Sequence, residues 1–379
     1  MITDDTKIKR AVVTIKIIGV GGGGNSVIER IAEGNELDVE LIAINTDAKQ
    51  LAYMEEAGVK ALAIGRELTK GLGTGGVADL GEAAAKGDEA KIKEVLKGAD
   101  LVFVTASMGG GAGTGAAPVV AKIAKDMGIL TVGVVTVPFS FEGARKKRIA
   151  NEGIAKMQGN LDALIVVHND NLMKLPENKH MTLVNAFKAA DDVLRQAINC
   201  IAELILTTGE INVDFADLTS TFRQSQSGDA LLGIGESQRS AIEAVQKAVE
   251  SPLVEKSLTG ARGLILNLSG SERMTLDDVG EATNYIRENT HPDVNIILGT
   301  VIDSSMGQTI RATIIATDFV DGVVMKAQRM EAPESKLKTE SIASLEPPSF
   351  MKQSTEKVPA FASRSDFTLP KFDPFHPKK

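Results

Sequence analysis

Short apolar runs alternate with helix-like segments through the first half of the chain. Runs rich in β-branched residues predict strands, and apolar residues spaced three or four positions apart predict helices. The predicted strands cover residues 12–18, 39–44, 61–64, 99–105, 129–137 and 163–167. Helices are predicted at residues 26–33, 116–127 and 142–158, and helical segments fill residues 79–96. Strands that alternate with helices are typical of a parallel sheet covered on both faces, so residues 11–180 are expected to form a Rossmann-like α/β domain.

The longest helical pattern covers residues 181–206 and predicts a central helix. At 1.5 Å per residue this helix is a rod of roughly 39 Å. A connector follows at 207–222 and includes a predicted loop at 210–217. Beyond it, the pattern predicts helices and strands in turn: helices at 237–249 and 276–288, and strands at 263–268, 294–301 and 309–317. Residues 223–320 are therefore expected to form a smaller α+β domain.

The two ends of the chain differ from its middle. Residues 1–10 are polar and charged, which predicts a flexible N-terminus and argues against a signal peptide. Residues 327–379 hold seven of the 12 prolines, together with many Ser, Lys and Glu, which is typical of a disordered linker and tail. Two apolar pieces in this tail, 358–361 and 369–372, are candidate docking peptides, and a chance cluster is the alternative for each.

Composition and charge exclude several classes of protein. The net charge of −8 and the pI of about 5.3 argue against a nucleic-acid-binding protein, which would show a basic face. The one cysteine, Cys200, cannot form an internal disulfide, and the four histidines are scattered, so no protein-held metal site is expected. No apolar run reaches the roughly 18 residues of a membrane span. We expect a soluble, cytoplasmic protein that reaches a membrane only indirectly.

Three glycine-rich loops follow predicted strands, at residues 19–24, 70–76 and 109–115. In a parallel sheet the carboxyl ends of the strands meet at one edge, where ligands bind. The loop at 109–115 has five glycines in seven residues and leads into a predicted helix. Its backbone N–H groups can approach an anion closely, and the helix N-terminus adds partial positive charge. A phosphate cradle is one interpretation of this loop, and a flexible turn is the other.

A dinucleotide-binding fold is a second hypothesis for the same edge. Residues 19–24 match G-x-G-x-x-G, and Asp47 lies 23 residues after Gly24, where a ribose-binding acid is expected. This reading would make the protein a nicotinamide-dependent oxidoreductase. The additional glycine-rich loop at 109–115 fits a triphosphate ligand better than it fits a dinucleotide. The G-x-x-x-x-G-K-[ST] motif does not occur, so the chain is not a P-loop protein.

Five motifs, in order, resemble the FtsZ family of tubulin-like bacterial cell-division GTPases. They are residues 18–25, 45–47, 109–115, 138–143 and 212–217, and the third is similar to the tubulin signature GGGTGTG. The resemblance implies a GTPase that binds GTP or GDP with Mg²⁺ and polymerises head to tail. It further implies protofilaments of the cytokinetic ring at the bacterial division site, with GTP hydrolysed between subunits. A scaffold that binds GTP without hydrolysing it is the alternative within this fold.

The resemblance implies a role for each matching residue. The residues expected to bind the nucleotide are Gly22, Gly23, Gly24, Asn25, Ser26, Gly110, Gly111, Ala112, Gly113, Thr114, Glu142, Lys146, Phe187 and Asp191. Among them, Phe187 is expected to stack on guanine, and Asp191 and Asn25 to read its edge. Those expected to position and activate the attacking water are Asn212, Asp214 and Asp217. Ala112 and Lys146 depart from the family pattern, which has threonine and arginine there, and the segment near 225–229 is about two residues longer than usual.

The length of the central helix has a consequence for catalysis. If this helix begins beside the nucleotide, Asp214 lies on the order of 35–40 Å from Phe187 and cannot reach its own chain's phosphates. Asp214 and Asp217 would instead complete the site of the next subunit, in a contact that produces an open filament. The tail piece Leu369–Phe372 would bind division proteins such as FtsA, which would hold the filament at midcell.

Overall fold

The computed structural model describes residues 13–34, 37–175, 178, 180–206, 213–225, 228–251, 253 and 258–319. These residues belong to one compact unit. Three predicted features lie outside the described residues, namely the segment 1–10, the catalytic candidate Asn212, and the tail 327–379 with its docking piece Leu369–Phe372.

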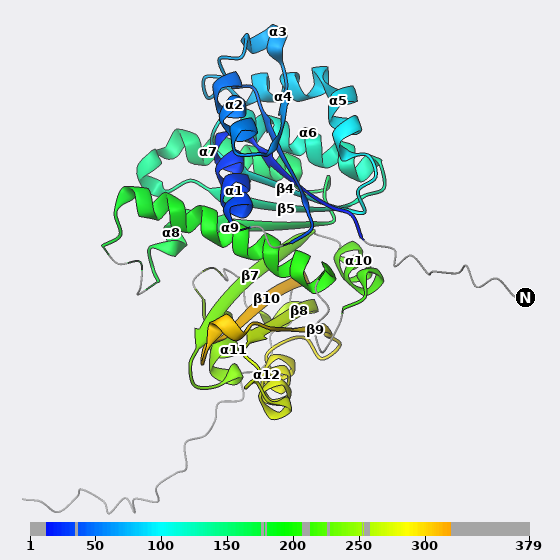
Figure 1. Cartoon of the computed structure of the whole chain (residues 1–379), viewed down its shortest axis with the longest axis vertical. Helices are drawn as coiled ribbons and strands as arrows, with labels where there is room; N and C mark the ends of the chain where they lie inside the picture. Colours follow the sequence, from blue (N-terminus) through cyan, green and yellow to red (C-terminus); the bar gives the residue numbers. More distant parts are fainter. Residues whose placement is uncertain are drawn as a thin grey trace, which may run out of the picture. The chain divides into compact units, whose positions relative to one another are not determined.

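Strands from both halves of the described chain join one sheet (Figure 1). Its strand order is β3-β2-β1-β4-β5-β6-β7-β10-β8-β9, and neighbouring strands from β3 to β6 are parallel. The strands of this parallel part are β1 (Ile15–Val20), β2 (Glu40–Asn45), β3 (Lys60–Ala63), β4 (Leu101–Ser107), β5 (Leu130–Val137) and β6 (Ala163–His168). The predicted parallel sheet is therefore confirmed, with slightly shifted strand ends.

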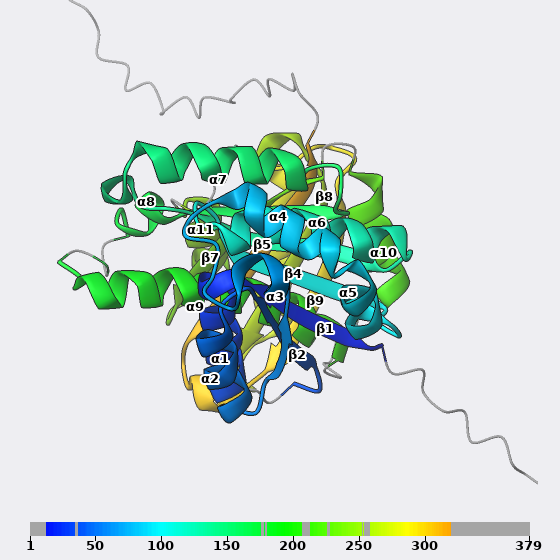
Figure 2. The same cartoon turned by 90° about the horizontal axis from the view of Figure 1, so that it is seen from above.

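Helices cover both faces of the parallel strands, as predicted (Figure 2). They are α1 (Gly21–Glu33), α2 (Ala48–Glu56), α3 (Arg66–Thr69), α4 (Ala78–Gly87), α5 (Glu89–Leu96), α6 (Ala112–Asp126), α7 (Ala144–Met157) and α8 (Asn169–Leu172). Ile17 of β1 packs into a core with α1 and α2, while the next residue, Ile18, packs into a second core with α4 to α7. A strand buried on both faces needs apolar residues at successive positions, which explains the apolar runs in the sequence.

The predicted central helix is α9 (Leu183–Leu206), and it packs on both parts of the sheet. Its buried residues share one hydrophobic core with residues of β5, β8 and β10. The other elements of the second half are α10 (Phe215–Gln224), β7 (Asp229–Ser237), α11 (Ala241–Val249), β8 (Ala261–Gly270), α12 (Leu276–Glu288), β9 (Asn295–Ile302) and β10 (Ile310–Phe319). Helices and mixed strands in this half confirm its α+β character.

The helical segments predicted within 79–96 are two helices, α4 and α5, which are separated at Asp88. Two other sequence predictions about this order of elements are wrong. The predicted helix 237–249 begins only at Ala241, and the residues before it form the unpredicted strand β7. The predicted loop 210–217 already contains the start of α10, because Asp214 caps that helix with its side chain.

Among the described residues, no helix combines the length and the apolar character that crossing a membrane requires.

Candidate nucleotide-binding site

Two long helices begin side by side at the carboxyl ends of the neighbouring strands β1 and β4. Gly21 opens α1 with a φ of +73°, and a Cβ there would lie 2.5 Å from the backbone nitrogen of Gly113 in the first turn of α6. Neither helix has an acidic residue in its first turn. Two helix N-termini that meet without a neighbouring carboxylate form a favourable site for an anion.

The three glycine-rich loops meet at this point. Gly111 is the N-cap of α6, and a Cβ there would collide with Thr74 of the loop 70–76. A Cβ at Gly23 of the first loop would likewise collide with Ser107, where β4 ends. The loops can close on one another only because these positions lack side chains. The prediction that the loops lie at one edge of the sheet is therefore confirmed.

The loop 109–115 is held in shape by Thr114. Its Oγ1 accepts a hydrogen bond from the N–H of Gly109 (2.8 Å), and the side chain is buried. Gly110, by contrast, has open space where a Cβ would lie. Ala112 is the first residue of α6, and nothing in the structure explains why it replaces the family's threonine.

Asn25 is buried beside the first loop and ties three segments together. Its Nδ2 donates to the carbonyl oxygen of Gly19 (3.1 Å), and its Oδ1 accepts from Nδ2 of Asn45 (2.7 Å). Asn45 also donates to Oε1 of Gln50 (2.7 Å), which lies 3.1 Å from the position of a Cβ at Gly22. Ser26 donates to the carbonyl oxygen of Gly22 (3.2 Å). These bonds fix the mouth of the first loop; contact of Asn25 with a base stays a prediction.

An aromatic cluster lies where α9 begins. Phe187 is 40% exposed and packs edge-on against Phe139, with ring centroids 5.5 Å apart, and against Phe141 at 6.3 Å. Phe139 and Phe141 are stacked on each other at 5.0 Å. The neighbouring rings hold Phe187 in place and leave part of it accessible, which is what stacking on a planar base requires.

Glu142 and Lys146 form an ion pair beside these rings. Nζ of Lys146 lies 3.1 Å from Oε2 of Glu142, whose Oε1 accepts from the N–H of Phe139 (3.0 Å). The carbonyl oxygen of Lys146 is 3.0 Å from the position that a Cβ at Gly109 would occupy. Lys146 therefore adjoins the glycine-rich loop 109–115, with Glu142 paired to it; contact of either residue with a ribose or a phosphate stays a prediction.

Asp191 follows Phe187 by one helical turn and is mostly buried, with 14% of its side chain exposed. The pKa of its carboxyl is raised to about 6, chiefly by burial and also by the nearby carboxylates of Asp192 and Glu29. Arg30 of α1, with Nε 3.2 Å from Oδ2, opposes the rise. Perturbed carboxyl groups of this kind are common at functional sites.

Asp214 and Asp217 lie at the opposite edge of the sheet. Both are exposed on α10, which adjoins the amino ends of β4 and β5: Arg223 donates to the carbonyl oxygen of Gly128 (3.1 Å), just before β5. A strand the length of β4 spans roughly 20 Å or more. The structure therefore brings the nucleotide candidates together but keeps Asp214 and Asp217 away from them, as expected.

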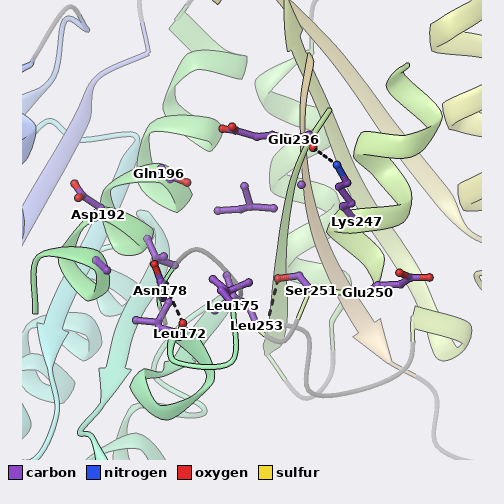
Figure 3. Close-up of a pocket in the computed structure, with 14 residues that line it drawn as sticks. Leu172, Leu175, Asn178, Asp192, Gln196, Glu236, Lys247, Glu250, Ser251 and Leu253 are labelled. Carbon is purple, nitrogen blue, oxygen red and sulfur yellow. Dashed lines mark hydrogen bonds between the residues drawn. The ribbon is translucent and has the colours of Figure 1, made fainter. Parts of the chain in front are cut away.

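A cavity of about 760 Å³ lies elsewhere, between α8–α9 and β7–α11 (Figure 3). Asp192 and Gln196 line it from α9, and Glu236 and Lys247 line it from the second half of the chain. Nζ of Lys247 donates to the carbonyl oxygen of Glu236 (3.0 Å). None of the residues predicted to bind nucleotide or activate water is among its lining residues.

Two family models match the chain. The GTPase domain of the Tubulin/FtsZ family matches residues 14–177, and the FtsZ family C-terminal domain matches residues 228–320. An empty FtsZ dimer from M. jannaschii is 39% identical, with 82% of this chain and 89% of that chain covered and a TM-score of 0.77. The chain belongs to the tubulin/FtsZ family. CetZ2 from Haloferax volcanii, solved as a GTPγS-bound protofilament, shares the fold at 22% identity, with 82% of this chain and 95% of that chain covered and a TM-score of 0.67.

Membership of the tubulin/FtsZ family decides between the two hypotheses for the glycine-rich edge. The chain is a tubulin-like polymerising GTPase that binds guanine nucleotide. The acid required by the dinucleotide hypothesis is also engaged elsewhere: Asp47 caps α2, where its Oδ1 accepts from the N–H groups of Lys49 (2.9 Å) and Gln50 (3.2 Å).

Sequence reasoning missed two residues that organise the site. Arg30 pairs with Asp191 across 161 positions of sequence. Asp170 accepts hydrogen bonds from both the N–H and the hydroxyl of Ser140, which fixes the loop before the aromatic cluster. Burial opposes ionisation of Asp170, but the bonds from Ser140 outweigh it and lower the pKa of the carboxyl. Asp170 lies just after β6, at the carboxyl end of the strand, which is where ligands bind in parallel sheets.

Proposed function

We propose that this GTPase assembles head to tail into protofilaments of the cytokinetic ring at the bacterial division site, and that GTP is hydrolysed between subunits. The chain belongs to a GTPase family, and one structural observation supports the rest of the proposal. The phosphate cradle and the acidic pair Asp214 and Asp217 lie at opposite edges of one sheet. A subunit that holds half of the site at each end needs a neighbour to complete it.

Within one subunit, residues 11–180 would act as the GTP-binding domain. Backbone N–H groups at the start of α1 and α6 would bind the phosphates, through residues 22–26 and 110–114. Phe187 would stack on the guanine, and Asp191 would accept hydrogen bonds from its edge. Glu142 and Lys146 would meet the ribose and the phosphate side.

Magnesium would be held chiefly by phosphate oxygens and water. The described residues contain no group of three His, Cys, Asp or Glu side chains that could hold a metal ion by themselves. Mg²⁺ commonly keeps several waters and binds through substrate phosphates, which fits a site of this kind. When bound, it would neutralise charge on the phosphates.

At the other end, Asp214 and Asp217 would act on the nucleotide of the adjoining subunit. Phosphoryl transfer depends on placement and on charge stabilisation, and a carboxylate can orient the attacking water and accept its proton. Both carboxylates are exposed on α10 and so are accessible to a partner. Asn212 would assist them. These three residues belong to the connector 207–222, which would act as the catalytic loop, and residues 223–320 would form the domain that activates the neighbour's GTPase.

Attachment to the membrane would be indirect. Leu369–Phe372 would bind a tethering division protein such as FtsA, and the filament would gather at midcell through that contact. This part of the proposal rests on the resemblance of the tail piece to the family's terminal peptide.

Light scattering with and without GTP and Mg²⁺, with phosphate release followed in parallel, tests the proposal. Hydrolysis is expected only above a threshold protein concentration, and it should coincide with the rise in scattering. A specific activity that does not change on dilution would contradict a shared site. Scattering without phosphate release would instead identify a scaffold that binds GTP without hydrolysing it.

A further inference from the structure

An ion pair joins α1, which opens with the first glycine-rich loop, to α9, which carries the candidate stacking ring. Nε of Arg30, on α1, lies 3.2 Å from Oδ2 of Asp191, on α9. Phe187 precedes Asp191 by four positions, so both side chains project from the same face of α9. Arg30 is therefore held beside the place where the edge of a base stacked on Phe187 would lie.

The surroundings of Asp191 disfavour its charge. Its side chain is 14% exposed, and that of Arg30 is 24% exposed. The pKa of the carboxyl is raised to about 6; burial is the largest cause, and Asp192 and Glu29 act in the same direction. Arg30 acts in the opposite direction, through both its hydrogen bond and its charge. Removal of the guanidinium would leave a carboxyl that is protonated over more of the neutral range.

The protonation state of Asp191 decides what it can bind. The guanine edge presents two neighbouring donors, N1–H and the 2-amino group. An ionised carboxylate accepts hydrogen bonds only, and each oxygen has two lone pairs, so Oδ2 can accept from Arg30 and from a base together. A protonated carboxyl turns one of the two oxygens into a donor, which then faces a donor of the base.

We propose that Arg30 is a positioning residue for guanine recognition: its guanidinium keeps Asp191 ionised and holds the carboxylate at the base site. The inference rests on the proposed function, in which Asp191 reads the guanine edge. A clamp that only joins α1 to α9 is the competing explanation, and it predicts neither a change in base selectivity nor a change in pH dependence.

The test compares GDP with IDP, whose base lacks the 2-amino group, because diphosphates separate binding from hydrolysis. Affinities are measured by isothermal titration on the full chain below its assembly concentration, from about pH 6 to about pH 8.5. For R30M we expect GDP affinity to fall roughly tenfold near pH 7 and the preference for GDP over IDP to shrink. Both should recover as the pH rises, because the carboxyl then ionises without help from Arg30.

Three variants make the result specific. R30K keeps a positive charge and should retain most of the GDP preference, with a pH profile close to that of the wild type. R195M is the matched control, since Nε of Arg195 pairs with Oδ1 of Asp192 at 3.3 Å on the same helix; it should bind GDP as the wild type does. In D191N the further change R30M should leave selectivity unaltered, because Arg30 acts through Asp191.

Equal losses for GDP and IDP at every pH would show a structural clamp and overturn the proposal, as would an R30M profile identical to that of the wild type. If R30M does not fold, R30Q, which keeps N–H donors without the charge, provides the same comparison. A wild-type chain that binds neither diphosphate would refute the proposed function itself. A D191N chain that prefers GDP as the wild type does would refute the role of Asp191, and the role of Arg30 with it.

Discussion

The hydroxyl of Thr114 accepts a hydrogen bond from the N–H of Gly109 (2.8 Å), and this bond closes the glycine-rich loop onto the first turn of α6. Gly109 has a φ of +101°, a conformation that only glycine adopts readily. The hydrogen bond from its N–H holds the loop in this shape. The buried hydroxyl thus organises the backbone groups that would face the phosphates.

T114V therefore tests the cradle at nearly constant volume. Valine leaves the N–H of Gly109 without its partner, and an unsatisfied buried donor costs about 1–3 kcal/mol. We expect GTP affinity, measured by isothermal titration below the assembly concentration, to fall about tenfold or more. T114S keeps the hydroxyl and should bind GTP like the wild type. Equal affinities for T114V and wild type would show that the bond does not shape the cradle.

G21A should separate the N-termini of α1 and α6. An alanine at a φ of +73° costs on the order of 1–2 kcal/mol, and its Cβ would also press on the nitrogen of Gly113. Gly58 is the matched control, because it has a φ of +79° and open space around a Cβ. The temperature of thermal unfolding should fall for both G21A and G58A, and by more for G21A. GTP binding should be lost only in G21A. Normal GTP binding by G21A would contradict the anion site.

Patterns that act over short distances could be predicted from the sequence. The apolar run of β1 predicts a buried strand, and the alternation of such runs with helical segments predicts a parallel sheet; β1 is buried on both faces. The glycine-rich loops were predicted at one edge because parallel strands end there together. The ring of Phe187 and the acids of α10 were assigned by family resemblance, and the structure adds their placement at opposite edges.

Features that depend on tertiary contacts could not be predicted in this way. β7 contains Gly233 and Gly235, which weaken its strand pattern; Gly235 is needed because α11 packs directly on it, so that a Cβ would collide with Ala244. Arg30 gave no signal, since its partner lies 161 positions away. α4 ends at Asp88, whose carboxylate accepts a hydrogen bond from the N–H of Gly65 (2.7 Å), a contact that helix periodicity cannot show.

F187W would report directly on the base site. The chain has no tryptophan, so a single indole gives the whole tryptophan signal. Stacking of guanine on this ring should change its emission on addition of GDP, with saturation at the affinity found by titration. Y53W is the control, because Tyr53 lies on α2 and is 55% exposed. A change in Y53W and none in F187W would place the base elsewhere.

Asp191 should make stability depend on pH. Its folded-state pKa of about 6 lies above the ordinary value of 3.8, so between these values the folded chain binds more protons than the unfolded chain. Stability must then fall as the pH rises from about 4 to about 6, by up to about 3 kcal/mol, and stay level above that. The free energy of unfolding of D191N, measured against pH in urea, should lack this fall. Parallel curves for the two proteins would show that Asp191 does not titrate as described.

D214S separates the catalytic role of Asp214 from its role in folding. Asp214 caps α10, where its Oδ1 accepts from the N–H of Ala216 (3.2 Å), and serine is an equally good cap that lacks the carboxylate. We expect D214S to bind GTP and to enter filaments, with phosphate release reduced about a hundredfold.

Mixing D214S with wild type then tests whether the site is shared between subunits. Each D214S subunit should leave its neighbour's site incomplete, so activity per wild-type subunit should fall below its value in pure wild-type filaments at the same total concentration. D38S, a change at an exposed aspartate between α1 and β2, should leave that activity unchanged. Wild-type activity that is indifferent to the fraction of D214S would mean that each chain hydrolyses GTP without its neighbour's Asp214, and would contradict a site shared between subunits.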